Sequence, residues 1–172
     1  MARVFIAVGS NIDPEQNVER AMAQLCRDVR LVAISTFYRT EPIGRRGAPQ
    51  FVNGMIEAET DRSPEGLKCD VLRRIEAELG RRRTADKNAD RTIDLDLVLY
   101  GDLALCTPEM VVPDPALFER AFLARTLFEL APDLRIPGST ITVRRLAQML
   151  SAHAMQPLSD LTAALRRNLA NE

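Results

Sequence analysis

The order of strand-type and helix-type segments constrains the fold of this chain most. Segments rich in β-branched and apolar residues predict strands at residues 4–8, 31–38, 51–60 and 92–99. Apolar residues at helical spacing predict one helix after Pro14 and another from Pro64 to Gly80. The resulting order, β-α-β-β-α-β, predicts an α+β fold of the ferredoxin-like type, with helices packed on one face of an antiparallel sheet.

Further elements follow the fourth predicted strand. The sequence predicts a short strand at 103–106 and extra C-terminal helices near 119–130, 142–151 and 158–170. The last helix carries a stripe of leucines that can pack on the domain or on a second copy of the chain. With 172 residues, 46% of them hydrophobic, the chain can form one substantial core. We therefore expect a single domain over 1–172, with 156–172 as a C-terminal helical extension, in a monomer or weak dimer.

Composition excludes several classes of function. The 23 basic and 24 acidic side chains give a net charge of -1, so we expect neither a nucleic-acid nor a membrane partner. The three cysteines lie far apart without a C-x-x-C motif, which favours reduced thiols and a cytoplasmic location. The first apolar run is too short for a signal peptide or a membrane span. A single histidine, His153, excludes sites that need paired histidines.

Two aspartates interrupt the apolar strand predicted at 92–99. Because strand side chains alternate, Asp94 and Asp96 share one face, with Cβ atoms about 6.5–7 Å apart. The other face carries Ile93, Leu95, Leu97 and Leu99. Two carboxylates so close repel unless a cation lies between them, and they could hold one or two Mg²⁺ ions with water and phosphate oxygens. The alternative is an open sheet face on which the aspartates are merely polar.

A basic segment leads directly into this strand. It contains Arg81, Arg82, Arg83, Lys87 and Arg91. Guanidinium groups match phosphate oxygens, and a metal neutralises a transferred phosphoryl group, so the combination favours an enzyme that acts on a polyphosphate. Asp86 and Asp90 reduce the local positive charge, and a solvated surface loop is the alternative. A Walker motif is absent, and a nucleic-acid module is disfavoured because aromatic residues are not interleaved with the arginines.

Several motifs, spaced in order over about residues 3–150, resemble the 6-hydroxymethyl-7,8-dihydropterin pyrophosphokinase family. They are FIAVGSN, YRTEPIG with a later FVN, IEAELGRRR, RTIDLDLVLYG and VPDPALFERAFLARTLFELAP. The resemblance implies a ferredoxin-like core. It also implies that pyrophosphate moves from ATP to the pterin hydroxymethyl group, giving the pterin diphosphate and AMP in folate biosynthesis.

The resemblance also implies roles for individual residues. Two Mg²⁺ ions would be held by Asp94 and Asp96, and one ion would lower the pKa of the attacking hydroxyl. The catalytic set would add Arg81, Arg83 and Arg91, the last two on a loop that closes over ATP. The nucleotide would be bound by Arg73, Glu76, Arg81, Arg83, Arg91, Asp114 and Arg120. The pterin would be bound by Thr40, Pro42, Ile43, Phe51, Asn53 and Phe122, with the two phenylalanines on either face of its ring.

The chain departs from the family pattern at three places. It has Asn88, Ala89, Asp90 and Arg91 where the family usually has Trp-Gly-Pro-Arg. It has Asp114 in place of a histidine and Thr126 in place of a proline. The metal-type pair and the pterin residues are kept, so pyrophosphokinase activity is the favoured interpretation. The alternative is a diverged paralogue that binds a pterin or a nucleotide with weak or altered catalysis.

Overall fold

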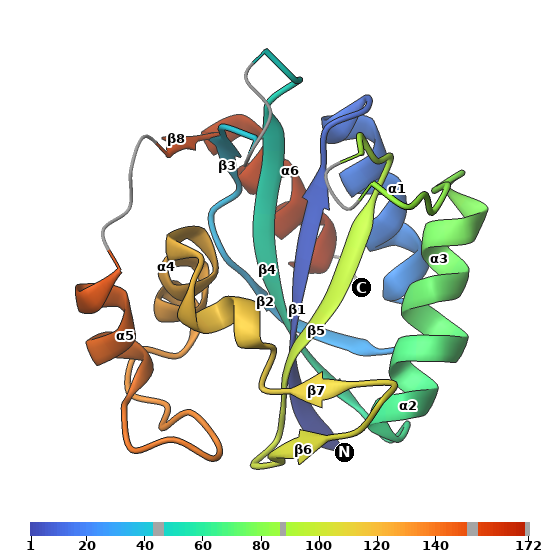
Figure 1. Cartoon of the computed structure of the whole chain (residues 1–172). Coiled ribbons are helices and arrows are strands. Elements are labelled where there is room, and N and C mark those ends of the chain that lie inside the picture. The colour runs from blue at the N-terminus through green and yellow to red at the C-terminus, as the bar shows by residue number, and fades with distance from the viewer. Residues whose placement is uncertain (43–46, 87–88, 151–154, 171–172) are drawn as a thin grey trace.

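The computed structural model describes residues 1–42, 47–86, 89–150 and 155–170, and its centre is an antiparallel sheet (Figure 1). Ile43, Lys87, Asn88 and His153 lie outside the described residues. The sheet runs β5-β1-β4-β3-β8, and β2 also pairs with β4. The strand bounds are β1 Ala2–Ser10, β2 Arg30–Ile34, β3 Tyr38–Thr40, β4 Phe51–Thr60, β5 Asp94–Tyr100 and β8 Gln156–Pro157. The predicted α+β architecture with an antiparallel sheet is confirmed.

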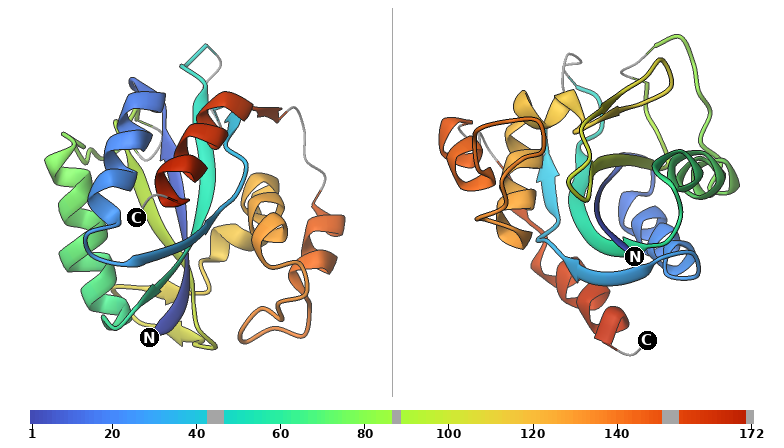
Figure 2. Two further views of the ribbon diagram at one scale, coloured as in Figure 1. Left: turned by 180° about the vertical axis from the view of Figure 1, so that it is seen from behind. Right: turned by 90° about the horizontal axis from the view of Figure 1, so that it is seen from below.

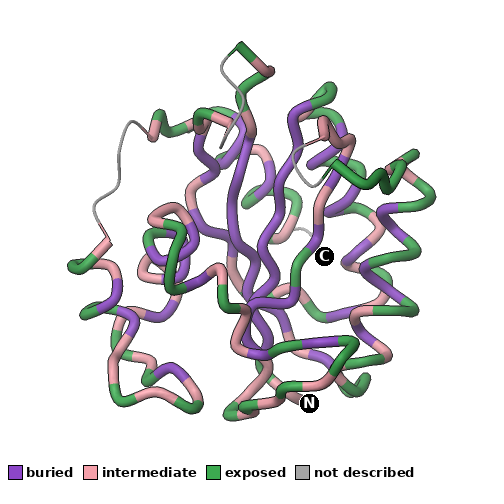
Figure 3. The backbone as a smooth tube through the Cα atoms, viewed as in Figure 1, coloured by how far each residue is buried: buried purple, intermediate pink, exposed green. Residues whose placement is uncertain are grey.

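Helices cover both faces of this sheet (Figure 2). One face packs on α1 (Pro14–Leu25), α3 (Arg73–Glu78) and α6 (Ser159–Ala170). The other packs on α4 (Ala121–Leu130) and α5 (Val143–Met149). The two helices of the predicted β-α-β-β-α-β unit, α1 and α3, thus lie on one face as expected, and the extra helices α4 and α5 cover the other. This second layer fits β1 and β4, whose side chains are buried on both faces, as the purple central strands of Figure 3 show.

The strand predicted at 31–38 is two strands, because the chain shifts along β4 between them. Ser35 accepts a hydrogen bond from the backbone of Met55 through Oγ (2.9 Å) and donates its own N–H to the Met55 carbonyl (3.0 Å). The buried ring of Phe37 lies over Gly54, where a Cβ atom would be 2.7 Å from the ring. Beyond Phe37 the chain pairs with β4 again, and β3 lies opposite the first residues of β4.

The helix predicted from Pro64 to Gly80 is one helical segment with a π-helical middle. It consists of α2 (Pro64–Gly66), the π-helical η1 (Leu67–Leu72) and α3. The Ser63 hydroxyl accepts a hydrogen bond from the Gly66 N–H (3.1 Å) and caps the first turn. Such π-helical turns are frequent at functional sites, and this one leads into the turn that carries Glu76 toward β5.

A β-bulge interrupts the alternation in β5. Leu97 pairs with Ile6 and Leu99 pairs with Phe5, so Val98 is an extra residue without its own partner. Leu97 therefore faces α1 and α3, whereas Leu99 packs with Phe5 on the α4 side. The prediction that Leu99 shares a face with the apolar residues before it is wrong for this reason. The Val98 carbonyl accepts the N–H of Asp114 (2.9 Å), which brings Asp114 beside β5.

The chain after β5 forms a small hairpin and then the remaining helices. The hairpin pairs β6 (Leu105–Cys106) with β7 (Val111–Val112), and the 3₁₀ turn η2 (Pro115–Phe118) leads into α4. The predicted helices near 119–130, 142–151 and 158–170 are confirmed as α4, α5 and α6. The leucine stripe of α6 packs on the domain itself, with Leu161 and Leu165 buried. All three cysteines are free, and among the described helices none is both long and apolar enough to cross a membrane.

Candidate active site

A cleft of about 650 Å³ opens where β1 ends and β5 begins, and η2 and α4 form its opposite wall. The predicted site residues that line it are Thr40, Pro42, Phe51, Asn53, Arg91, Asp94, Asp96, Asp114, Arg120 and Phe122. Arg73, Glu76, Arg81 and Arg83 do not line it. The fold thus brings the metal-type pair and the described members of the predicted pterin set into one cavity, and leaves part of the predicted nucleotide set outside its walls.

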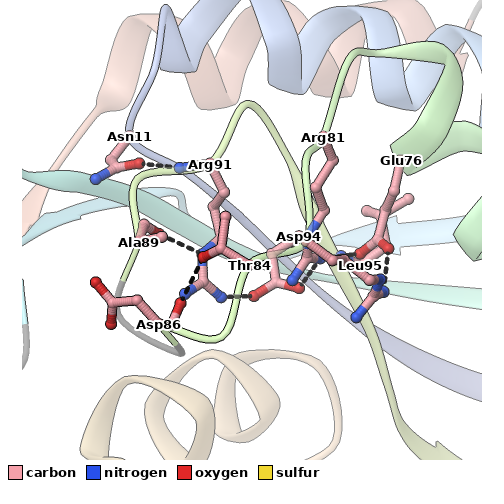
Figure 4. Close-up of polar contacts among 10 residues, drawn as sticks. Asn11, Glu76, Arg81, Thr84, Asp86, Ala89, Arg91, Asp94 and Leu95 are labelled. Carbon is pink, nitrogen blue, oxygen red and sulfur yellow. Dashed lines mark hydrogen bonds and ion pairs between the residues drawn. The ribbon is translucent and has the colours of Figure 1, made fainter.

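Glu76 lies behind the cleft at the centre of a buried charge network (Figure 4). Its side chain is 4% exposed and accepts the backbone N–H of Leu95 (2.9 Å). It also pairs with Arg81 and with Arg83 (2.7 Å). Burial raises the pKa of Glu76, and the backbone hydrogen bond and the two arginines oppose that rise. Glu76 therefore holds Arg81 in place, and direct nucleotide contacts by these residues stay predictions.

Asp94 is an ionised carboxylate held by two arginines. It pairs with Arg81, and the distance from Arg91 Nη1 to Asp94 Oδ2 is 2.5 Å (Figure 4). Burial alone would raise the pKa of Asp94, but the two guanidinium groups outweigh burial and hold that pKa below its ordinary value. Both carboxylate oxygens of Asp94 thus have cationic partners in the protein.

Asp96 has the opposite electrostatic environment. Part of its surface is open to solvent, yet the walls of the cleft remove much of its hydration, and this raises the pKa of Asp96 to about 7. The carboxylates of Asp94, Asp114 and Glu76 act in the same direction. Within the described residues, no basic side chain forms an ion pair with Asp96. The cleft therefore has an excess of negative charge at Asp96, which a cation would offset.

The donor set around Asp96 fits a hard divalent cation that arrives with other oxygen ligands. In the described part of the chain, no group of three or more His, Cys, Asp or Glu side chains could hold a metal ion. Asp94 and Asp96 alone leave most positions of an octahedral Mg²⁺ open. Water and phosphate oxygens are the ligands that Mg²⁺ ordinarily takes in such positions, so the pair fits a metal bound together with a polyphosphate.

Ser10 and Asn11 fix the chain just before β5, and our sequence predictions did not include them. The Asn11 side chain donates to Asp90 Oδ1 (2.8 Å) and accepts the backbone N–H of Arg91 (2.7 Å). The Ser10 hydroxyl donates to the Thr92 carbonyl (2.6 Å). Both side chains are buried, so this polar pair directs Arg91 toward Asp94. The signal was present in the sequence as two polar residues directly after the apolar run FIAVG.

The predicted pterin residues form the other half of the cleft. Asn53, 8% exposed on β4, donates from Nδ2 to Thr40 Oγ1 (2.7 Å) on the adjacent β3. Phe51 is half-buried, and the Arg91 guanidinium lies 5.8 Å from its ring centroid. Phe122 is half-buried at the start of α4. It packs against the α4 core cluster, which is the group of buried apolar residues between the sheet, α4 and α5. Two aromatic rings and a fixed amide thus border the same space, as a flat heteroaromatic ligand requires.

Gly9 joins the two halves of the cleft. On the central strand β1 it pairs with Asn53 on one side and with Asp94 on the other. A Cβ atom at Gly9 would lie 2.6 Å from Asn53 Oδ1, so a larger residue could not keep the present position of the amide. The close approach of the Asn53 side chain therefore explains why this position is a glycine, a requirement that our sequence predictions did not include.

At two of the three departures from the family pattern, the replacing side chain forms a hydrogen bond in the structure. Asp114 Oδ1 accepts the Ala116 N–H (2.8 Å) and caps η2, while its charge contributes to the raised pKa of Asp96. The buried Thr126 hydroxyl donates to the Phe122 carbonyl (2.8 Å) within α4. Asn88 lies outside the described residues. Arg120 is exposed at the N-cap of α4, and the described residues give it no ion-pair partner.

Comparisons with known proteins identify relatives of this chain and solved structures with a similar fold. A relative from Pseudomonas aeruginosa, named 2-amino-4-hydroxy-6-hydroxymethyldihydropteridine pyrophosphokinase, is 37% identical over 165 residues, covering 94% of this chain and 98% of the relative. A protein of the same name from Haemophilus influenzae is 35% identical over 162 residues, covering 92% and 99%. Wild-type HPPK-DHPS from Plasmodium falciparum, solved with STZ-DHP, matches the fold with a TM-score of 0.68 at 12% identity.

That match covers 86% of this chain, but this chain spans only 41% of the solved one. Residues 5–132 match the model of the 7,8-dihydro-6-hydroxymethylpterin-pyrophosphokinase (HPPK) family. Together with the identity to the two bacterial relatives over nearly their whole length, this match shows that the chain belongs to the HPPK family.

Proposed function

We propose that this protein transfers pyrophosphate from ATP to the hydroxymethyl group of 6-hydroxymethyl-7,8-dihydropterin, giving the pterin diphosphate and AMP. The observation that carries the proposal is the cleft that joins Asp94 and Asp96 to two aromatic rings and the Asn53 amide. Neither half alone would specify the reaction. A carboxylate pair suits metal-bound phosphates, and the ring pair suits a flat acceptor, so their union fits transfer between the two.

The charged half would bind and orient the phosphates. Asp94 and Asp96 would hold two Mg²⁺ ions, which when bound would neutralise phosphate charge and lower the pKa of the attacking hydroxyl. Arg91 and Arg120 line the cleft and would contact phosphate oxygens through their guanidinium groups. Arg81 would act through Asp94, because it is 12% exposed and pairs with that carboxylate.

The ring half would orient the acceptor. Phe51 and Phe122 would stack on the two faces of the pterin, and Asn53 with Thr40 would hydrogen-bond its polar edge. Because Gly9 separates Asn53 from Asp94 by one strand, a pterin held at Asn53 would lie beside the metal-type pair. We also infer that residues 1–172 act as a single domain in the cytoplasm, as a monomer or weak dimer, without a nucleic-acid or membrane partner.

An AMP assay tests the proposal. The protein is incubated with 6-hydroxymethyl-7,8-dihydropterin, ATP and Mg²⁺, and the nucleotide products are separated. We expect AMP in equal amount to the pterin diphosphate, and none when the pterin or Mg²⁺ is omitted. ADP as the product, or no turnover that depends on the pterin, would contradict the proposal.

A diverged paralogue that binds a pterin or a nucleotide with weak catalysis is the second candidate, and Asp114 is the observation that favours it. Asp114 adds a negative charge next to Asp96, in the half of the cleft that would receive phosphates. Calorimetry distinguishes the two functions. Pterin binding without ATP binding at any Mg²⁺ concentration supports the binding protein, whereas ATP binding that requires Mg²⁺ supports the enzyme.

A further inference from the structure

We propose that the C-terminal part of the chain supplies an apolar wall of the pterin subsite, formed by Met149, Leu150 and Met155. This inference rests on the proposed function, because the wall would contact the pterin that the cleft is proposed to bind. All three residues line the cleft together with the predicted pterin residues. They lie beyond residue 132, where the match to the family model ends, so that match does not assign them.

None of the three side chains is fully buried in the protein core. Met149 is 59% exposed at the end of α5, and Met155 is half-buried just before β8. Apolar side chains that line a cleft lose their remaining exposure when a ligand fills it, as in most small-molecule sites. Met is also suited to such a role, because its flexible thioether makes favourable contacts with aromatic rings.

The first end of the wall is fixed by the packing of α5. Val143 and Leu146 are buried in the α4 core cluster, and Leu150 packs against the same cluster. The Leu150 N–H donates to the Leu146 carbonyl (3.0 Å), which continues the helix to the edge of the cleft. Met149 therefore extends from an ordered helix that packs on the helix carrying Phe122.

The second end is fixed by pairing with the sheet. Directly after Met155, β8 pairs antiparallel with β3, so that Gln156 lies opposite Arg39. The Leu158 N–H donates to the Phe37 carbonyl (2.8 Å), and the buried Thr162 hydroxyl accepts the Phe37 N–H (2.9 Å). Met155 is thereby tied to the strand that carries Thr40, one of the residues predicted to read the pterin edge.

The position of the wall predicts which ligand it affects. The three residues are uncharged, and they belong to segments that pack on α4, which carries Phe122, and pair with β3, which carries Thr40. The phosphates would be bound by the carboxylate pair and the arginines, so the wall should change pterin affinity and leave ATP affinity unchanged. An apolar wall also selects for a flat aromatic ring and against a polar acceptor of similar size.

Calorimetric titration of the full-length protein tests the wall. The probes are 6-hydroxymethyl-7,8-dihydropterin and a non-hydrolysable ATP analogue, each with Mg²⁺. In the double variant M149S/M155S we expect pterin binding to weaken about tenfold, since contact with two apolar side chains is lost. Binding of the ATP analogue should stay within about twofold. The volume-conserving variant M149L/M155L should restore pterin affinity to within about threefold.

The control variant is V111S, which changes an exposed apolar residue of β7 that does not line the cleft. The inference is overturned if M149S/M155S binds the pterin as the wild type does. It is also overturned if both ligands weaken together with a lower melting temperature, because the wall would then only support the fold. Wild-type protein that forms AMP while the double variant keeps its pterin affinity removes this inference alone. Wild-type protein that binds no pterin removes the proposed function as well.

Discussion

The two halves of the cleft are built in different ways. In the charged half, ion pairs fix the positions: Arg81 and Arg91 pair with Asp94, and Glu76 holds Arg81 from behind the cleft. In the ring half, backbone pairing of β3 with β4 sets the positions, and Asn53 and Thr40 make one neutral hydrogen bond. The charged half should therefore respond to the removal of charge, and the ring half to changes in shape.

Removal of Asp96 should have the largest effect on catalysis. We expect D96A to lower kcat about a thousandfold or more, since the Mg²⁺ ions proposed to hold the phosphates would lose a carboxylate ligand. Stability should stay within about 0.5 kcal/mol or rise slightly, because Asp96 is exposed and repels neighbouring carboxylates. Thermal unfolding and steady-state turnover measure both quantities, with D102A on the exposed turn after β5 as control. A large loss of stability with D96A would mean that Asp96 has a structural role.

Disruption of the support behind Asp94 should affect both stability and activity. We expect E76Q to lower the free energy of unfolding by about 2–4 kcal/mol, because Arg81 loses a buried anionic partner. Turnover should fall about tenfold to a hundredfold as Asp94 loses its orientation. The matched control is E78Q on the same helix, whose partner Arg74 is at the surface. Equal effects of both substitutions in denaturant titrations would contradict the buried network.

A side chain at Gly9 should act at the boundary between the halves. We expect G9A to raise the KM for the pterin about tenfold, since the added Cβ displaces the Asn53 amide at a cost of about 1–2 kcal/mol. The KM for ATP should change less. G66A is the control, because its Cβ would meet nothing nearer than the Ser63 hydroxyl at 3.3 Å, within a helix. Steady-state kinetics with an equal rise in both KM values would show that the boundary is not at Gly9.

Removal of one hydrogen bond in the ring half should have the smallest effect. In T40V the Asn53 amide loses its acceptor at 2.7 Å. One such hydrogen bond contributes about 1 kcal/mol, so we expect the KM for the pterin to rise about threefold to fivefold. The kcat should be nearly unchanged, because no charge is removed. Initial-rate measurements at saturating ATP give this separation, and a fall in kcat with an unaltered KM would argue against a binding role for Thr40.

Local patterns predicted the elements that dominate the fold. Alternation in the strand at 92–99 correctly placed Asp94 and Asp96 together, and helical spacing located α4, α5 and α6. The β-bulge at Val98 was not predictable, because bulges depend on pairing with β1 and leave the sequence pattern apolar. The two-residue β8 was also missed, since Pro157 and a short segment give no strand signal.

The support of the candidate site was harder to predict than its lining. Glu76 lies on α3, whose sequence gives no sign that this carboxylate is buried. Its partners come from the loop that follows α3 and from β5. Met149 and Met155 read as ordinary helix and loop residues, because only tertiary packing brings them to the cleft. Sequence patterns identify side chains of one element well, whereas contacts between distant segments depend on the assembled fold.

The fate of the two outer phosphates of ATP tests the central claim most directly. The protein is incubated with the pterin, Mg²⁺ and ATP that carries a radioactive label on either the β- or the γ-phosphate. Transfer of an intact pyrophosphate predicts that both labels appear in the pterin product and that the AMP released is unlabelled. A pterin product that contains only the γ-label, with the β-label left in ADP, would contradict the account.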